Sequence, residues 1–300
     1  MAFSLDFSRS SGHNVRERVQ GRLLALPALL WLILFFLLPL FIVFAVSFMT
    51  RGRAGSVTLP LTLENYNRVF TTYSPIFVDS ILIAFITTVI CLIAGYPLAF
   101  FISTRKRKTM QQIALFLVIL PFWTNFLVRT YAWRVILGTD GLLNAGLLNL
   151  GLITQPLNIL NTDLAVLIGL VYGFLPFMVL PIYSSVERFD FRLVEAAHDL
   201  GANDLRAFLR IVLPLTLPGV AAGCILVFIP TIGAYVTPDL LGGTQGVMIG
   251  NLIDQQFKGT GHWPRGAAAS MVMMAIVGVG LLFYTWINPV SYTHLRAHED

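Results

Sequence analysis

The sequence predicts an all-α polytopic membrane protein with six transmembrane helices. Of its 300 residues, 56% are hydrophobic and 12% are charged, and the mean hydropathy is +0.77. Soluble chains carry about 25% charged residues, so this composition excludes an ordinary soluble protein. The chain also holds six apolar runs, each long enough for a helix of about 20 residues to cross a bilayer. Because backbone groups in lipid must be hydrogen-bonded within the chain, we interpret these runs as helices.

The first apolar run extends from Leu23 to Thr50 without a charged residue. It is longer than a signal-peptide core of about 7 to 15 residues, and no small-residue cleavage site follows it. We therefore expect a retained first span, preceded by a cytoplasmic segment at residues 1–22. The other five spans are predicted at Phe77–Thr104, Gln111–Leu137, Thr162–Val186, Val212–Val236 and Gly266–Ile287.

The lysines and arginines predict how the chain is oriented. Thirteen of the 20 lie in the N-terminal segment, in the connections after the second and fourth spans and in the C-terminal tail. Only five lie in the opposite connections. Since positive segments resist translocation, we expect both termini to be cytoplasmic. The net charge of +5 then reflects orientation, and it requires no nucleic-acid partner.

Enzyme motifs are absent from the sequence. It contains no GxSxG and no HExxH, and none of its lysines follows a glycine as a phosphate-binding loop requires. The two cysteines, Cys91 and Cys224, lie inside apolar runs and offer neither a disulfide framework nor metal-ligand spacing. We expect no catalytic residue, no metal and no cofactor in this chain.

The connection between the fourth and fifth spans, residues 187–214, has the pattern of two short helices that meet at a glycine. Asp190 can cap the first helix, and Gly201 can supply the left-handed conformation that ends it. Asn203 or Asp204 can cap the second helix. This pattern alone is equally consistent with a docking element and with a well-capped soluble loop.

A spaced motif in this connection favours the docking element. EAA is followed after three residues by glycine, after nine more by isoleucine, and after one more by Leu-Pro. The motif resembles the signature of permease subunits of bacterial ABC importers, and every defined position is filled. These positions are Glu195, Ala196, Ala197, Gly201, Ile211, Leu213 and Pro214.

The resemblance implies the type I ABC importer permease fold, in which residues 187–214, the coupling loop, insert into a groove of a cytoplasmic ATPase. It also implies a second homologous permease subunit, an ATPase dimer that binds ATP and Mg²⁺, and a periplasmic solute-binding protein. The residue types suit docking. Ala196 and Ala197 keep the helix slim, Glu195 offers a charge to a basic partner group, and Gly201 allows the bend.

A wider resemblance, over residues 23–287, is to the spermidine/putrescine permeases. It rests on PFWTNFLVRTYAWRVIL at 121–137, FIPTIGAYVTPDLLGGTQGVMIGNLIDQQF at 228–257 and WPRGAA at 263–268. It implies one transmembrane permease domain in a bacterial inner membrane, with a small cationic substrate. Import of another small organic solute is an alternative. An ion-coupled secondary transporter is a further alternative, although five of the six span cores contain no ionisable residue.

A polyamine path needs carboxylates or aromatic faces that can meet ammonium groups. Asp239 follows the fifth span, and Asp254 lies on a short amphipathic helix predicted within residues 247–257. Helix capping or an outer ion pair is the alternative role for both. Tyr235 and Trp123 could form cation-binding faces, although aromatic residues near helix ends also anchor at the bilayer interface.

Other residues in the spans have two interpretations. The prolines and glycines of the fifth span permit kinks, and we choose this span to line the path. Its Gly219 and Gly223 also match GxxxG, as do Gly169 and Gly173 in the fourth span, and this pattern predicts close helix packing. Arg129 in the third span would repel a polycation, so we assign it to snorkelling, ion pairing or contact with a binding protein.

The C-terminal tail, residues 288–300, departs from the short basic end that the family resemblance implies. Its sequence, PVSYTHLRAHED from Pro289, resembles the translated adapter sequence found at the ends of metagenomic genes. We expect residues from about Val290 not to be native.

Overall fold

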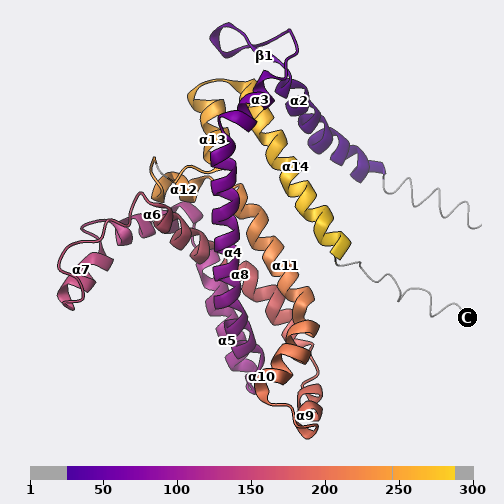
Figure 1. The fold of residues 1–300 in the computed structure, drawn as a ribbon, viewed down its shortest axis with the longest axis vertical. Helices are drawn as coiled ribbons and strands as arrows, with labels where there is room; N and C mark the ends of the chain where they lie inside the picture. Colours follow the sequence, from indigo (N-terminus) through magenta and orange to yellow (C-terminus); the bar gives the residue numbers. More distant parts are fainter. Residues whose placement is uncertain (1–25, 245, 288–300) are drawn as a thin grey trace, which may run out of the picture.

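The computed structural model describes residues 26–244 and 246–287 (Figure 1). The predicted segments 1–22 and 288–300, and the start of the first span at Leu23, lie outside the described residues. Almost every described element is helical. In chain order the elements are η1 (Ile33–Leu37), α2 (Leu38–Ser47), β1 (Thr50–Arg51), η2 (Arg53–Gly55), β2 (Val57–Thr58), α3 (Glu64–Thr71), α4 (Ser74–Ser103), α5 (Lys108–Ile119), η3 (Leu120–Trp123), α6 (Phe126–Leu137), α7 (Leu142–Asn149), α8 (Asp163–Glu187), α9 (Arg192–Asp199), α10 (Asp204–Ala207), η4 (Phe208–Val212), α11 (Leu213–Ile232), α12 (Val236–Leu241), α13 (Ile249–Asp254), η5 (Gln255–Gly259) and α14 (Trp263–Ile287).

Three long helices, α4, α8 and α11, run side by side and form the core (Figure 1). Their facing side chains, among them Tyr96, Met178 and Val227, are buried in one cluster. Glycines bring the backbones close together, because a Cβ at Gly219 would lie 2.5 Å from the Ser185 Cβ and one at Gly223 would lie 2.8 Å from the Met178 Sδ. This face of α11 therefore packs on α8, as GxxxG predicts. The fifth span, whose prolines and glycines permit kinks, is helical without a break from Leu213 to Ile232, with Pro218 and Pro230 inside the helix.

The predicted number of spans agrees with the structure. Among the described residues, five helices are long and apolar enough to cross a membrane, and a sixth span results if one bent helix pair counts as one. The first of them, Leu26–Ser47, packs against α14 at the side of the core (Figure 1). None of the residues in its most apolar 18-residue stretch is buried, which suits a helix whose surface faces lipid.

The third predicted span, Gln111–Leu137, is not one straight helix. α5 and η3 run beside α4 as far as Trp123, and the chain then turns by 92° into α6 and leaves the bundle sideways (Figure 1). Pro121 has no N–H group to donate, and the Asn125 side chain accepts a hydrogen bond from the Leu127 N–H at 2.8 Å, so a new helix begins there. Hydropathy could not reveal this break, because Thr124 and Asn125 are only two polar residues within an otherwise apolar stretch.

The end of the molecule opposite the coupling loop is built by the β1–β2 hairpin together with α3 and α13 (Figure 1), and we call it the hairpin end. β1 and β2 pair antiparallel, with Thr50 opposite Thr58. The buried Asn65 of α3 donates to the carbonyl oxygens of Ser47 and Met49 at 3.0 and 2.9 Å, which satisfies the last turn of α2. The Ile249 N–H donates to Ser80 Oγ at 2.9 Å and fixes α13 to α4.

Candidate functional sites

The coupling loop folds into two short helices that meet at Gly201, as its capping pattern predicts. α9 extends over Arg192–Asp199, and Asp190 accepts hydrogen bonds from the Arg192 backbone N–H and side-chain Nε, both at 3.1 Å. These bonds hold the pKa of Asp190 below its usual range. At the second helix, Asn203 is the capping residue and accepts from the Arg206 N–H at 2.9 Å.

Gly201 ends α9 in the left-handed conformation, with φ of +83°. The Gly201 N–H donates to the His198 carbonyl oxygen at 2.8 Å, and the Ala202 N–H donates to the Ala197 carbonyl oxygen at 2.9 Å. This pair of bonds is the Schellman motif, which requires positive φ at the residue after the C-cap. A Cβ at Gly201 would meet no described atom within 4 Å, so only the backbone conformation demands glycine here.

The two alanines of the motif have different surroundings. Ala197, the second alanine of the motif, is 8% exposed and therefore buried. Ala207 of α10, which is not part of the motif, is also buried, at 1% exposure. Ala196 and Glu195 are exposed. The loop also presents Leu200 to solvent at 89% exposure, as well as the exposed Leu193 and Leu205. An apolar surface on a polar connection is typical of a protein interface.

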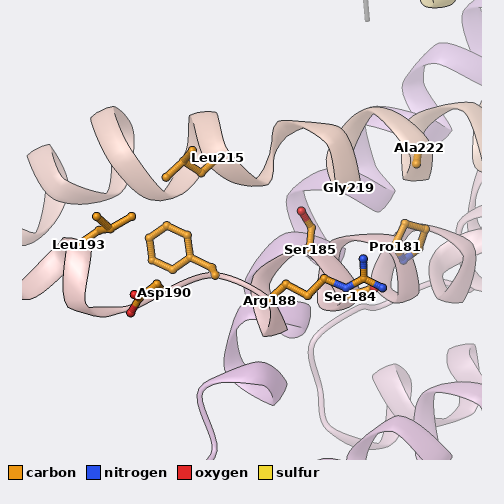
Figure 2. A pocket seen from close by; sticks show the side chains of 10 residues that line it. Pro181, Ser184, Ser185, Arg188, Asp190, Leu193, Leu215, Gly219 and Ala222 are labelled. Atoms are coloured by element: carbon orange, nitrogen blue, oxygen red, sulfur yellow. The ribbon is translucent and has the colours of Figure 1, made fainter. Parts of the chain in front are cut away.

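A hollow of about 520 Å³ opens between α8 and α11 beside the coupling loop. Figure 2 shows Gly219 and Ala222 on one wall and Pro181, Ser184 and Ser185 on the other. The guanidinium of Arg188 extends along α8 toward Pro181 and Ser184 and away from Asp190. The hollow thus has a positive, hydroxyl-bearing wall at the loop end of the bundle.

At the hairpin end, three of the four predicted substrate-contact residues meet. Tyr235, Asp239 and Asp254 line one pocket of about 500 Å³ between α12, α13 and η5, which we call the acidic pocket. Asn251 holds its walls together by donating from Nδ2 to the Tyr235 carbonyl oxygen at 3.0 Å. The fourth residue, Trp123, is separate. It lies on η3 at the helix break, is 76% exposed, and its ring contacts Phe116.

Lys258 is a member of the acidic pocket that the sequence reasoning missed. Its ammonium lies 2.5 Å from Asp254 Oδ1 and 5.4 Å from the centroid of the Tyr235 ring. The hydrogen bond to Asp254 raises the pKa of Lys258, and the charge of Asp239 adds to this effect. The four-residue spacing between Asp254 and Lys258 was the available signal. The pocket therefore already holds one primary ammonium.

No group of three or more His, Cys, Asp or Glu side chains that could hold a metal ion occurs within residues 26–244 and 246–287. The two cysteines are free. The candidate sites are therefore the coupling loop at one end of the bundle and the acidic pocket at the other.

Comparison with known proteins identifies relatives over most of the chain. Residues 95–290 match the family described as binding-protein-dependent transport system inner membrane component. The spermidine/putrescine transport system permease protein PotB of Haemophilus influenzae is 46% identical over 259 residues, which are 86% of this chain and 90% of that protein. PotB of Escherichia coli is 46% identical over 85% of this chain and 92% of that protein. The inner membrane ABC transporter permease protein YdcU of Escherichia coli is 33% identical over 76% of each chain.

Solved structures share the fold. A chain of a bacterial ABC transporter involved in the import of the acidic polysaccharide alginate aligns with a TM-score of 0.68 and 16% identity, over 93% of this chain and 98% of that one. A chain of the alginate transporter in complex with an alginate pentasaccharide-bound periplasmic protein gives 0.68 and 15%, over 92% and 96%. At these identities the likeness concerns the fold alone.

Proposed function

Since the chain belongs to the family of binding-protein-dependent transport system inner membrane components, we propose that it is the permease subunit of an ABC importer for spermidine and putrescine. The observation that carries this proposal is the 46% identity to two PotB permeases over at least 85% of the chain. The permease domain, residues 23–287, lies in a bacterial inner membrane with both termini in the cytoplasm. It pairs with a second homologous permease subunit.

The coupling loop docks on a cytoplasmic ATPase dimer, which binds ATP and Mg²⁺. The exposed Leu200 and Leu205 supply apolar contact area, and the exposed Glu195 supplies a charge for a basic partner group. Closure of the ATPase dimer moves the loop, and the helices change between outward-facing and inward-facing arrangements. The subunit itself performs no covalent chemistry.

A periplasmic binding protein delivers the cargo at the hairpin end, and the acidic pocket receives one ammonium group of the cargo. Asp239 and Asp254 offer two carboxylates, and Tyr235 offers an aromatic face that is 37% exposed. The position of Lys258 supports this assignment, because its side chain ends in the same primary ammonium as putrescine and spermidine. A role for Trp123 would be separate, beside the helix break.

Uptake by the reconstituted importer tests the function. The subunit is placed in proteoliposomes with the second permease, the ATPase dimer and the binding protein, and labelled spermidine, putrescine and an unrelated sugar are compared. We expect ATP-dependent uptake of the two polyamines and none of the sugar. Equal uptake of all three solutes would contradict the substrate assignment. Uptake without ATP would instead favour a secondary transporter.

A further inference from the structure

One buried hydrogen bond joins two core helices next to the coupling loop. Tyr96 Oη of α4 and Thr216 Oγ1 of α11 lie 2.9 Å apart, and the two residues are 8% and 0% exposed. Thr216 Oγ1 also lies 2.9 Å from the Val212 carbonyl oxygen, which can only accept. Since the threonine hydroxyl has a single hydrogen, it donates to Val212, and Tyr96 is the donor to Thr216. The three residues form a chain of hydrogen bonds from α4 to α11.

This chain of bonds ends on an unusual part of the backbone. Val212 is the last residue of η4, a π-helical turn over Phe208–Val212 that connects α10 to α11. Single π turns hold one extra residue and occur frequently at functional sites. A π turn can pass to α-helical geometry only if the helix on one side rotates. η4 is therefore the place where a movement of the coupling loop could be absorbed before it reaches α11.

The first residue of η4 is also fixed to α4. The Phe208 ring packs edge-on against Tyr96 at 5.6 Å and against Phe100 at 6.3 Å between ring centroids. Phe191, which precedes α9, packs on the same Phe100 ring at 6.3 Å. Both ends of the π turn are thus attached to α4, at Phe208 by ring contact and at Val212 through the two hydroxyl groups.

We propose that Tyr96 and Thr216 are positioning residues for energy coupling: they hold η4 so that a movement of the coupling loop displaces α4 and α11 together. The inference rests on the proposed importer function. Without the bond, α11 can rotate at η4 while α4 stays in place. ATP hydrolysis would then continue without a complete change between the outward-facing and inward-facing arrangements of the helices.

The test uses the complete importer in proteoliposomes and measures both ATP hydrolysis and uptake. Y96F removes one hydroxyl and leaves Thr216 its bond to Val212, and T216V keeps the side-chain shape. We expect each variant to retain ATPase stimulation by the loaded binding protein. Uptake per ATP should fall about fivefold, because losing a hydrogen bond of about 1 kcal/mol changes the ratio of two conformations by that factor. The double variant should fall no further than either single variant, because both remove the same bond.

T231V is the matched control, since Thr231 is equally buried in α11 and its hydroxyl bonds the Val227 carbonyl of its own helix at 2.6 Å. We expect its uptake per ATP to match that of the wild type. An unchanged ratio in Y96F and T216V, or equal losses of ATPase and uptake, would overturn the inference. If the wild type takes up another solute instead of polyamines, the proposed substrate fails, and the same ratio measured with that solute still decides the role of Tyr96.

Discussion

Arg129 bridges the break in the third span by donating a hydrogen bond from Nη1 to the Pro121 carbonyl oxygen at 2.8 Å. The two residues lie on opposite sides of the 92° bend. The guanidinium also lies 5.4 Å from the centroids of Phe122 and Phe126 and 5.7 Å from that of Tyr172. Arg129 therefore adds a charged donor to a carbonyl oxygen that also accepts from Thr124 Oγ1 at 2.7 Å, and it joins α6 to η3 across the break.

Loss of this side chain should destabilise the subunit. For R129A we expect the free energy of unfolding to fall by about 1–3 kcal/mol, the range for a charge-assisted hydrogen bond with cation–π contacts. R129K should lie between R129A and the wild type, because an ammonium can reach the carbonyl but cannot stack flat on rings. Thermal unfolding in detergent measures the order of stability of the wild type, R129K and R129A. R134A is the control, since Arg134 is an exposed arginine of the same helix. Equal losses in R129A and R134A would contradict the role of the bridge.

Gly219 of α11 and Gly173 of α8, which belong to two separate GxxxG pairs, should respond in opposite ways to alanine. A Cβ at Gly219 would lie 2.7 Å from the Pro181 carbonyl oxygen, whereas a Cβ at Gly173 would meet no described atom within 4 Å. We expect G219A to lower the melting temperature, at a cost of about 1–3 kcal/mol from overpacking. G173A should leave it unchanged or raise it, because alanine favours helix. Similar melting temperatures for the two variants would mean that α8 and α11 do not approach as closely as described.

These contrasts show what the sequence can predict. Hydropathy located the spans, and the capping residues located the two short helices of the coupling loop, because both are local patterns that a helix or its ends require. The helix break at Asn125 depends on a single capping side chain inside an apolar run. The bond between Tyr96 and Thr216 joins residues 120 positions apart, so no local pattern could indicate it. Which of the glycines Gly219 and Gly173 faces a neighbour likewise depends on helix rotation in the folded protein.

The conformation of Gly201 leads to a prediction about coupling. A residue with a Cβ at its φ of +83° is strained by about 1–2 kcal/mol, and a β-branched residue more so. In the complete importer, we expect uptake per ATP to fall in the order Gly201, G201N, G201A, G201V, since asparagine tolerates positive φ. The same ratio of uptake to hydrolysis measures this order. Full coupling in G201V would count against the role of the bend between α9 and α10.

In the acidic pocket, Lys258 should compete with the cargo. An exposed ion pair such as that with Asp254 is weak, because water screens the two charges. K258M should therefore lower the apparent KM for spermidine by up to about fivefold, because it frees the carboxylate. D254N should raise KM by removing that carboxylate. Initial uptake rates at saturating binding protein measure both effects, with K106M as a lysine control outside the pocket. A rise of KM in K258M would show that Lys258 orders the pocket and does not compete.

His262 should make the stability of the subunit sensitive to acid. It is 9% exposed, and burial together with the positive charges of Arg265, Arg51 and Arg68 lowers its pKa from the ordinary value of 6.5. Its Nδ1 accepts the Arg265 backbone N–H at 3.4 Å, and only an unprotonated Nδ1 can accept. Below pH 6.5 the unfolded chain binds the proton more readily than the folded chain, so stability falls with falling pH.

The variant H262N removes the titrating group and retains an acceptor, Oδ1, near the position of Nδ1. Between about pH 7.5 and pH 5.5, which bracket the ordinary histidine pKa, we expect the melting temperature of the wild type to fall by a few degrees more than that of H262N. H198N is the control, because His198 is an exposed histidine of the coupling loop, where an ion pair with Asp204 adds little. It should keep the pH dependence of the wild type. If H262N and the wild type lost the same stability on acidification, protons bound elsewhere would account for the effect, and His262 would not be the group that senses pH.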